Sequence, residues 1–289
     1  MRCVTITIMN EDIDIFLKYL SQEKSYSQNT VAAYRNDLNQ LTVFITTEGA
    51  KGISKSYEEL LKAYLLKLRE KRYSAATTAR KIASAKSFFK FMVDSGRLRE
   101  NPSENLVSPQ VSRHSLRFLS SSEYQSLLAE PAKLSTPEAK RDAVMLELLY
   151  ATGLRISELV SLNVKDIDLK QNYVHVNSRR LIPFDSRLNQ VLRNFLRNDR
   201  LDLLYDEKEE ALFLNRRGKR LTRQGFWQII KEYASKAGLG SRVTPHTLRH
   251  SFARHQLQSG ADLHQLQQLL GHAYISSTRI YRQSPPRQG

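Results

Sequence analysis

Cysteine is nearly absent from this 289-residue chain, which contains only Cys3. A single thiol excludes an internal disulfide framework and any zinc site built from several cysteines. Long apolar runs are also missing, since a stretch such as 143–149 is interrupted by Glu147, whereas a membrane-spanning helix needs about 20 apolar residues. The short apolar start meets acidic residues from Glu11 onward, which is not the layout of a secretory signal. We therefore expect a soluble cytoplasmic protein.

Acidic residues are in deficit. The chain has 45 Lys and Arg against 29 Asp and Glu, which gives a formal net charge of +16 at pH 7. With 40% hydrophobic and 9% aromatic residues, intrinsic disorder as the main character is excluded. A basic excess of this size favours a nucleic-acid partner, because neutralising phosphates releases counterions. The alternative is a solvated basic surface that only aids solubility.

The first hundred residues have the spacing of amphipathic helices. Ser27 and Ser74 are suitable N-caps, and the apolar residues after each of them recur at steps of three and four. The helices that we expect are 12–22, 27–49, 56–71 and 74–96. They predict a four-helix bundle. Its polar faces carry basic residues that either lie on phosphates or are solvated, namely Arg80, Lys81, Lys86 and Lys90.

Helical periodicity is interrupted around Pro102 and Pro109. This predicts a first domain over 1–105, a linker over 106–117 and a second domain over 118–289. In the second domain, a helix from about residue 137 should end at a glycine. Short strand-like runs follow at 164–169, 173–176, 180–184 and 211–214, with Pro183 favouring an edge strand. The remainder reads as helical, so the fold class is mainly α with one small antiparallel sheet.

Five polar residues in the second domain suit chemistry on a phosphodiester. Two guanidiniums can bind phosphate oxygens bidentately and stabilise added charge. Imidazoles can hydrogen-bond phosphate and exchange protons near neutral pH. A tyrosine hydroxyl, with an unperturbed pKa of about 10, becomes a nucleophile when cations lower that pKa, and its phosphate ester preserves the energy of the cut bond. Such a reaction needs neither ATP nor a metal. The residues are Arg155, His246, Arg249, His272 and Tyr281.

These residues, in this order and with the neighbouring stretches 221–227, 245–253 and 260–272, resemble the tyrosine recombinase (phage integrase) family, most closely the bacterial XerC/XerD recombinases. The resemblance covers nearly the whole chain and implies that 1–105 is a core-binding domain. It implies that Arg155 and Arg249 clamp the scissile phosphate and that Tyr281 is the nucleophile. By the same resemblance, His246 assists proton transfer, His272 hydrogen-bonds the phosphate and Glu158 orients a catalytic group.

The resemblance also implies the reaction and the partners. Duplex DNA would be clamped between the two domains, cut through a 3′-phosphotyrosine and rejoined by way of a Holliday junction. The partners would be a double-stranded recombination site and three further protomers, as a homotetramer or as a heterotetramer with a second recombinase. No cofactor is implied, and the protein would be nucleoid-associated. DNA contacts are expected from basic residues, namely Lys86, Lys90, Arg216, Arg217, Lys219, Arg220 and Arg223.

The chain departs from the family pattern in two places. The family usually carries a catalytic lysine in a β-hairpin, but the matching stretch 174–183 is short and has none. Arg179 or Arg180 could supply the charge there, and Lys219 is a further candidate by charge alone. A DNA-binding homologue with impaired cleavage is therefore the alternative function. Family members usually continue beyond the tyrosine nucleophile into a C-terminal helix that docks on a neighbouring protomer. The prolines in 284–286 predict that no such helix forms here.

Histidine spacing raises one further hypothesis. His246 and His250 are four residues apart, as in a zinc-protease helix, but Thr247 stands where that motif needs a glutamate. No third ligand is evident, so we expect no metal site. We interpret His250, His255 and His264 as packing or surface residues.

Overall fold

The computed structural model describes the chain except for residues 1, 50–55, 111–115, 178–179, 241–242 and 283–289. The chain divides into two compact units, Met1–Arg113 and His114–Gly289. This division falls inside the predicted linker, 106–117. Arg179 and the prolines at 285 and 286 lie outside the described residues.

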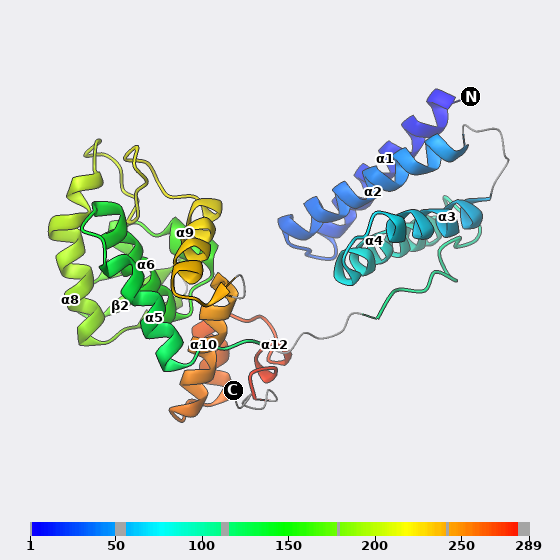
Figure 1. The fold of residues 1–289 in the computed structure, drawn as a ribbon. Helices are drawn as coiled ribbons and strands as arrows, with labels where there is room; N and C mark the ends of the chain where they lie inside the picture. Colours follow the sequence, from blue (N-terminus) through cyan, green and yellow to red (C-terminus); the bar gives the residue numbers. More distant parts are fainter. Residues whose placement is uncertain (1, 50–55, 111–115, 178–179, 241–242, 283–289) are drawn as a thin grey trace. The chain divides into compact units, whose positions relative to one another are not determined.

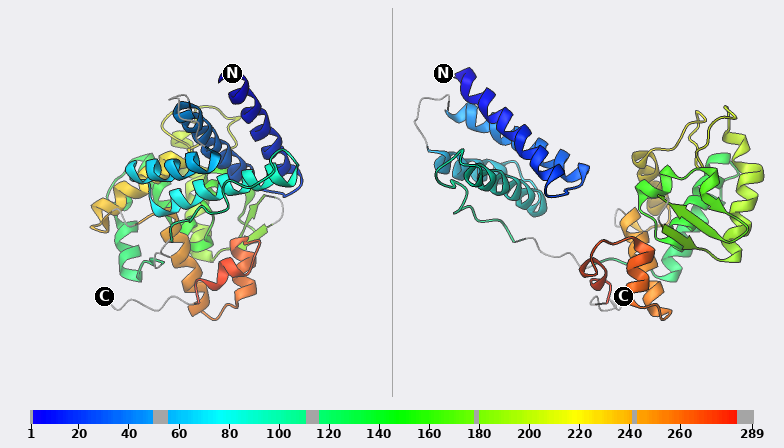
Figure 2. Two further views of the ribbon diagram at one scale, coloured as in Figure 1. Left: turned by 90° about the vertical axis from the view of Figure 1, so that its right-hand side faces the viewer. Right: turned by 180° about the vertical axis from the view of Figure 1, so that it is seen from behind.

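The described part of the first unit is a bundle of helices that lie side by side (Figures 1 and 2). The bounds are α1 Arg2–Gln22, α2 Gln28–Gly49, α3 Tyr57–Glu70 and α4 Ala75–Asp94. The predicted helices are all present, and α1 begins ten residues before the expected position 12. Ser27 and Ser74 accept backbone hydrogen bonds at the starts of α2 and α4, as capping requires.

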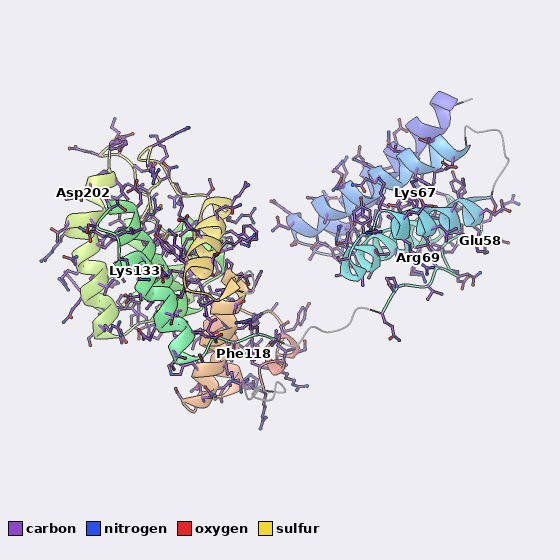
Figure 3. All side chains as sticks on the ribbon, viewed as in Figure 1. Glu58, Lys67, Arg69, Phe118, Lys133 and Asp202 are labelled. Atoms are coloured by element: carbon purple, nitrogen blue, oxygen red, sulfur yellow. The ribbon has the colours of Figure 1, made fainter. Side chains whose placement is uncertain are left out.

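The bundle is stabilised by burying one face of each helix. On α3, Leu60, Tyr64 and Leu68 are buried, whereas Lys67 and Arg69, labelled in Figure 3, are exposed. A spacing of four residues places the three buried side chains on one stripe. Apolar burial therefore sets the packing of the bundle, as the periodicity predicts.

One basic side chain of the bundle is not on its surface. Lys81 is only 3% exposed and donates to Asp37 at 3.0 Å and to Gln40 at 2.8 Å. Arg80 also pairs with Asp37. The interpretation of Lys81 as a surface residue is therefore wrong, because a buried charge needs a carboxylate partner and Asp37 supplies it.

In the second unit, helices surround a small sheet. The bounds are α5 Ser121–Ala132, α6 Pro137–Thr152, α7 Ile156–Ser161, α8 Ser186–Asn194, α9 Arg223–Lys236, α10 Pro245–Gln258, α11 Leu263–Leu270 and α12 Ser276–Arg279. Short helical turns occupy Val164–Asp166, Phe195–Asp199 and Leu201–Leu203. Helix α6 packs against both α5 and α10 (Figure 1), which makes it the central helix of this unit.

The described sheet is antiparallel, in the order β1-β2-β3. Its strands are β1 Ile167–Asp168, β2 Tyr173–Val176 and β3 Arg180–Pro183. Because β3 lies at an edge, Pro183 is tolerated there, as expected. The predicted strand at 211–214 is wrong, since that segment makes only isolated bridges from Ala211 and Leu214. No helix in the described part of the chain is both long enough and apolar enough to cross a membrane.

The buried pair in the bundle generates a stability prediction. We expect Asp37→Ala to lower the free energy of unfolding by about 3–5 kcal/mol, because Lys81 would be left as a buried charge without a carboxylate. Chemical denaturation of the wild type and the variant measures this difference.

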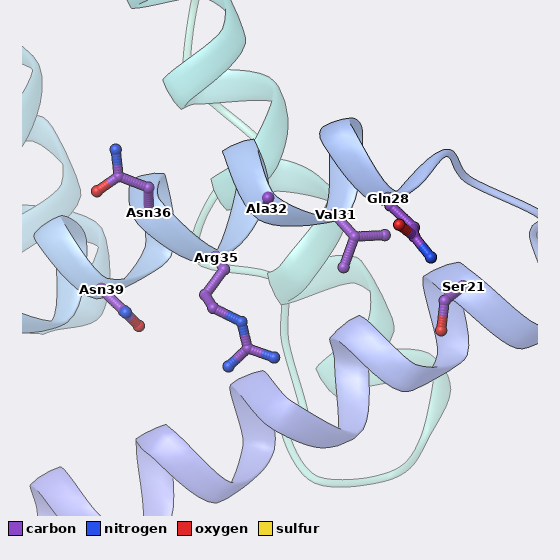
Figure 4. Close-up of a pocket in the computed structure, with 7 residues that line it drawn as sticks. All are labelled: Ser21, Gln28, Val31, Ala32, Arg35, Asn36 and Asn39. Carbon is purple, nitrogen blue, oxygen red and sulfur yellow. The ribbon is translucent and has the colours of Figure 1, made fainter. Parts of the chain in front are cut away.

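The matched control is an exposed ion pair on the same bundle. Arg35, which lines the shallow pocket of Figure 4, pairs with Asp14 at 2.6 Å, and the two side chains are 52% and 59% exposed. We expect Asp14→Ala to change the free energy of unfolding by less than about 1 kcal/mol. Equal losses in the two variants would contradict the role assigned to burial.

Candidate active site

The carbonyl ends of two helices hold the two arginines that the sequence singles out. Helix α6 ends at Gly153 in the left-handed conformation, and α11 ends at Gly271 in the same way. Arg249, which is 5% exposed, donates to the carbonyl oxygens of Gly153 and Leu270. Arg155 donates from Nη2 to the carbonyl of Gly271 at 2.9 Å. Terminal carbonyls carry the negative end of the helix dipole, so both guanidiniums are fixed where that charge favours them.

Glu158 links two of the cations. It accepts from the backbone N–H of Arg155 at 2.7 Å, from Nη1 of Arg155 at 2.9 Å and from Nη2 of Arg180 at 2.6 Å. Burial alone would raise the pKa of this carboxyl, but the Arg155 backbone hydrogen bond and the charge of Arg180 outweigh burial and lower the pKa. Glu158 is therefore an ionised anchor between the two guanidiniums.

The Arg180 side chain enters the site next to Gly271. A Cβ at Gly271 would lie 2.0 Å from Nη1 of Arg180, so a side chain at this position would displace the guanidinium. The Arg180 side chain is 14% exposed, and among the described residues its Nε has no hydrogen-bond partner. The short hairpin therefore delivers a cation to the side of the site formed by the end of α11.

Tyr281 lies just beyond α12 and is 4% exposed. Its hydroxyl lies 3.0 Å from Nδ1 of His250. Burial raises the pKa of Tyr281, and the charges of Arg249 and Arg155, with a hydrogen bond from Arg249, oppose that rise. The hydroxyl is thus directed to the cations, and the chain folds back to bring together His250 and Tyr281, which are 31 positions apart in the sequence.

His272 follows the end of α11 and contacts a buried hydroxyl. Its Nδ1 lies 3.0 Å from Oγ1 of Thr278, which is fully buried. Burial and the nearby charges of Arg249, Arg155 and Arg180 lower the pKa of His272 to about 4. With Nδ1 occupied by Thr278, the other ring nitrogen is the one left for a ligand.

The two other histidines of the site, His246 and His250, lie on α10. His246 is exposed at the start of that helix, and its ring lies 6.3 Å from the ring of His250. Burial, then the nearness of His246, Arg249 and His272, lowers the pKa of His250 to about 4. Within the described ranges, no group of three or more His, Cys, Asp or Glu side chains has the arrangement of a metal site.

Two contacts of the site were not predicted from the sequence, those made by His250 and Thr278. The interpretation of His250 as a packing or surface residue is incomplete, because this ring contacts the Tyr281 hydroxyl. The only signal in the sequence is that His250 directly follows Arg249 and lies one helical turn from His246.

The basic residues proposed for DNA contacts differ in their exposure and in the partners that their side chains bind. Arg217 and Arg223 are exposed. Arg220 donates to the carbonyls of Val160 and Leu162 and to Asn163, so its guanidinium ties α7 to the segment after it. The others have surface partners: Lys86 with the Glu104 carbonyl, Lys90 with Asp94, Arg216 with Glu138 and Lys219 with Asp206.

The lowered imidazole pKa values generate a pH prediction. Between pH 6.5, the ordinary pKa, and about 4, the unfolded chain binds a proton at residue 272 that the folded chain excludes. This extra proton uptake by the unfolded chain therefore lowers the free energy of unfolding as the pH falls through that window. We expect His272→Asn to lose stability less steeply than the wild type on acidification. Thermal unfolding near neutral pH and near the middle of the window measures the difference, and parallel losses would contradict it.

Comparison with known proteins matches both units to one family. The phage integrase family matches residues 117–287, and the phage integrase N-terminal SAM-like domain matches residues 13–96. A tyrosine recombinase XerC of Roseiflexus sp. (strain RS-1) is 45% identical over 279 residues, covering 94% of this chain and 89% of the relative. A tyrosine recombinase XerD of Shewanella oneidensis is 38% identical, covering 93% of this chain and 90% of the relative.

Solved structures agree on the fold. The XerH site-specific recombinase bound to palindromic difH substrate, in a post-cleavage complex, has a TM-score of 0.72 at 22% identity over 93% of this chain and 90% of that one. A lambda integrase dimer bound to a COC′ core site has a TM-score of 0.71 at 18% identity and covers 97% of each chain. The resemblance noted in the sequence is confirmed, and the chain belongs to the phage integrase family of tyrosine recombinases.

Proposed function

We propose that this chain is a site-specific recombinase that cuts and rejoins duplex DNA through Tyr281. The hydroxyl oxygen of Tyr281 attacks the scissile phosphorus, forming a 3′-phosphotyrosine and releasing a 5′-hydroxyl. The observation that carries this proposal is the convergence of the Tyr281 hydroxyl with Arg249 and Arg155. Because the tyrosyl ester retains the energy of the cut bond, the 5′-hydroxyl of an exchanged strand can reverse the attack without ATP.

In this proposal, Arg155 and Arg249 bind the non-bridging oxygens of the scissile phosphate. Each guanidinium uses donors on helix-terminal carbonyls, which fixes its plane while its other N–H groups remain directed to the ligand. Fixed cations stabilise the charge of the pentavalent transition state without reorganising during the reaction. Glu158 acts as a positioning residue, because it is ionised and its hydrogen bonds go to Arg155 and Arg180.

His272 and His246 have different parts in this scheme. His272, neutral and held by Thr278, donates a hydrogen bond from Nε2 to a phosphate oxygen. His246 lies at the N-terminus of α10, where the helix dipole also favours an anion. Its imidazole is exposed, and we assign it to assisting proton transfer at the phosphate.

Arg180 takes the place of the hairpin lysine in supplying charge. Its guanidinium is held by Glu158 and lies against Gly271, close enough to lower the pKa of His272. A guanidinium is a very weak acid and does not release its proton readily. We therefore assign Arg180 to charge stabilisation, and the departing 5′-oxygen takes its proton from water.

DNA binding and assembly complete the proposal. Arg217 and Arg223, both exposed, are assigned to backbone phosphates, as are the side chains of Lys86, Lys90, Arg216 and Lys219. The substrate is a duplex recombination site, and four protomers, of this chain alone or with a second recombinase, exchange paired strands through a Holliday junction. The relatives in solved structures are bound to such DNA sites. The reaction would take place in the cytoplasm, on the nucleoid.

The first test uses a nicked duplex carrying the site mapped by sequencing DNA crosslinked to the protein in its own cell. We expect wild-type protein to form a covalent protein–DNA adduct, because the short strand beyond the nick diffuses away and religation fails. Tyr281→Phe should bind this duplex with unchanged affinity and form no adduct, since only the hydroxyl is removed. Gel electrophoresis under denaturing conditions measures the adduct. Binding by the wild type without any adduct would favour a DNA-binding homologue that has lost cleavage.

The second test concerns Arg180. We expect Arg180→Ala to slow single-turnover cleavage by about 10²-fold or more, because the transition state loses a fixed cation. Arg180→Lys should recover part of that rate. As the control, Arg216→Ala removes an exposed arginine and should weaken DNA binding without changing the rate at saturating protein. Cleavage by Arg180→Ala at the wild-type rate would end the assignment of Arg180.

A further inference from the structure

A neutral imidazole faces the nucleophile directly. Nδ1 of His250, on α10, lies 3.0 Å from the hydroxyl of Tyr281, beyond α12, and the two ring centroids are 5.4 Å apart. Tyr281 is 4% exposed, so bulk water has little access to its hydroxyl. When the hydroxyl oxygen bonds to phosphorus, its proton therefore needs an acceptor inside the protein.

The groups around His250 fix its charge. His246 and Arg249 face it from its own helix, His272 faces it from the end of α11 and Tyr281 from beyond α12. Burial and these neighbours lower its pKa to about 4, so the ring is neutral near pH 7. In the tautomer with its proton on Nε2, Nδ1 has a lone pair directed to the hydroxyl.

Other neighbours of the Tyr281 hydroxyl have no lone pair available to accept its proton. Arg249, which contacts it, has no acceptor atom. Nδ1 of His272 is already hydrogen-bonded to Thr278, and the function proposed above assigns Nε2 of His272 to a phosphate oxygen. His250 is therefore the acceptor that the geometry offers to the phenol proton.

We propose that His250 is a further catalytic residue, the general base that takes the Tyr281 proton during strand cleavage; this inference rests on the function proposed above. As the bond between the Tyr281 oxygen and phosphorus forms, the phenol proton moves to Nδ1 of His250. The bond from phosphorus to the 5′-oxygen then breaks with its electron pair, and that oxygen takes a proton from water. In rejoining, the 5′-hydroxyl gives its proton back to water as its oxygen attacks phosphorus. The bond from phosphorus to the Tyr281 oxygen breaks with its electron pair, and the imidazolium of His250 returns its proton to the leaving phenolate.

The timing of the transfer follows from the same charges. Before DNA binds, the cations near His250 oppose its protonation. The scissile phosphate brings negative charge among those cations and raises the proton affinity of the imidazole. The phenol becomes more acidic as its oxygen bonds to phosphorus. Transfer is thus coupled to bond formation, where general base catalysis contributes about 10²- to 10⁴-fold.

The test compares two histidines on α10 in the full-length protein. His250→Asn places an amide oxygen near the position of Nδ1, which retains a hydrogen-bond acceptor but removes the basic nitrogen. His255→Asn, at an exposed position of the same helix, is the matched control. We expect single-turnover cleavage of the nicked duplex to fall at least tenfold in His250→Asn and to be unchanged in His255→Asn. DNA affinity should be equal in all three proteins.

A second measurement separates proton transfer from positioning. Tyr281 is replaced by a difluorinated tyrosine, whose phenol is more acidic, in both the wild-type and the His250→Asn backgrounds. We expect fluorination to restore most of the lost rate in His250→Asn and to have a smaller effect when His250 is present. The acidic limb of the wild-type pH–rate profile should also be absent from His250→Asn.

Two outcomes would overturn the inference: wild-type cleavage by His250→Asn, or the same fold-change on fluorination in both backgrounds. Either result would leave the adduct formed by the wild type intact. Failure of the proposed function would instead appear as no adduct in the wild type. The two failures are therefore distinguishable.

Discussion

Three guanidiniums converge in the catalytic unit, and the rest of the site depends on how their mutual repulsion is offset. Arg249 and Arg155 are held by carbonyl groups at the ends of α6 and α11, and Glu158 bridges Arg155 and Arg180. Partial negative charge from helix ends and one full negative charge therefore hold the cations in place. The offset is incomplete, since burial and the charge of Arg155 lower the pKa of Arg249 to about 10. A bound phosphate would supply the missing negative charge.

The same cations act on Tyr281, the proposed nucleophile, and on its neighbours. Burial raises the pKa of Tyr281 while Arg249 and Arg155 oppose that rise, so the phenol is protonated before a phosphate binds. Burial, followed by nearby charges that include Arg249, lowers the pKa of His250 and of His272, so both rings are neutral near pH 7. In the proposed function, activation of Tyr281 is thus tied to the arrival of the phosphate that it attacks.

Two left-handed glycines make this arrangement sterically accessible. A Cβ at Gly153 would lie 2.2 Å from the ring of Phe252, and one at Gly271 would lie 2.0 Å from Arg180. Each glycine therefore ends a helix, presents its carbonyl to an arginine and leaves space for a neighbouring side chain. In the proposed function, the short hairpin replaces the family's lysine only in charge, because Arg180 enters through the space at Gly271 and a guanidinium is a poor acid.

Local interactions are what the sequence by itself determined. The caps at Ser27 and Ser74 and the apolar spacing of the helices act within a few residues, so their outcome can be predicted from the chain alone. The family likeness of the ordered set from Arg155 to Tyr281 was legible for the same reason, as a linear pattern. Contacts between segments that are distant in the sequence could not be predicted in this way. Only the tertiary structure decided that Lys81 is buried on Asp37, that Arg220 binds backbone carbonyls and that His250 meets Tyr281. The charge of a residue and its position on a helix do not specify its partner when that partner is dozens of residues away. Packing of the core decides which of these distant residues come within hydrogen-bonding distance.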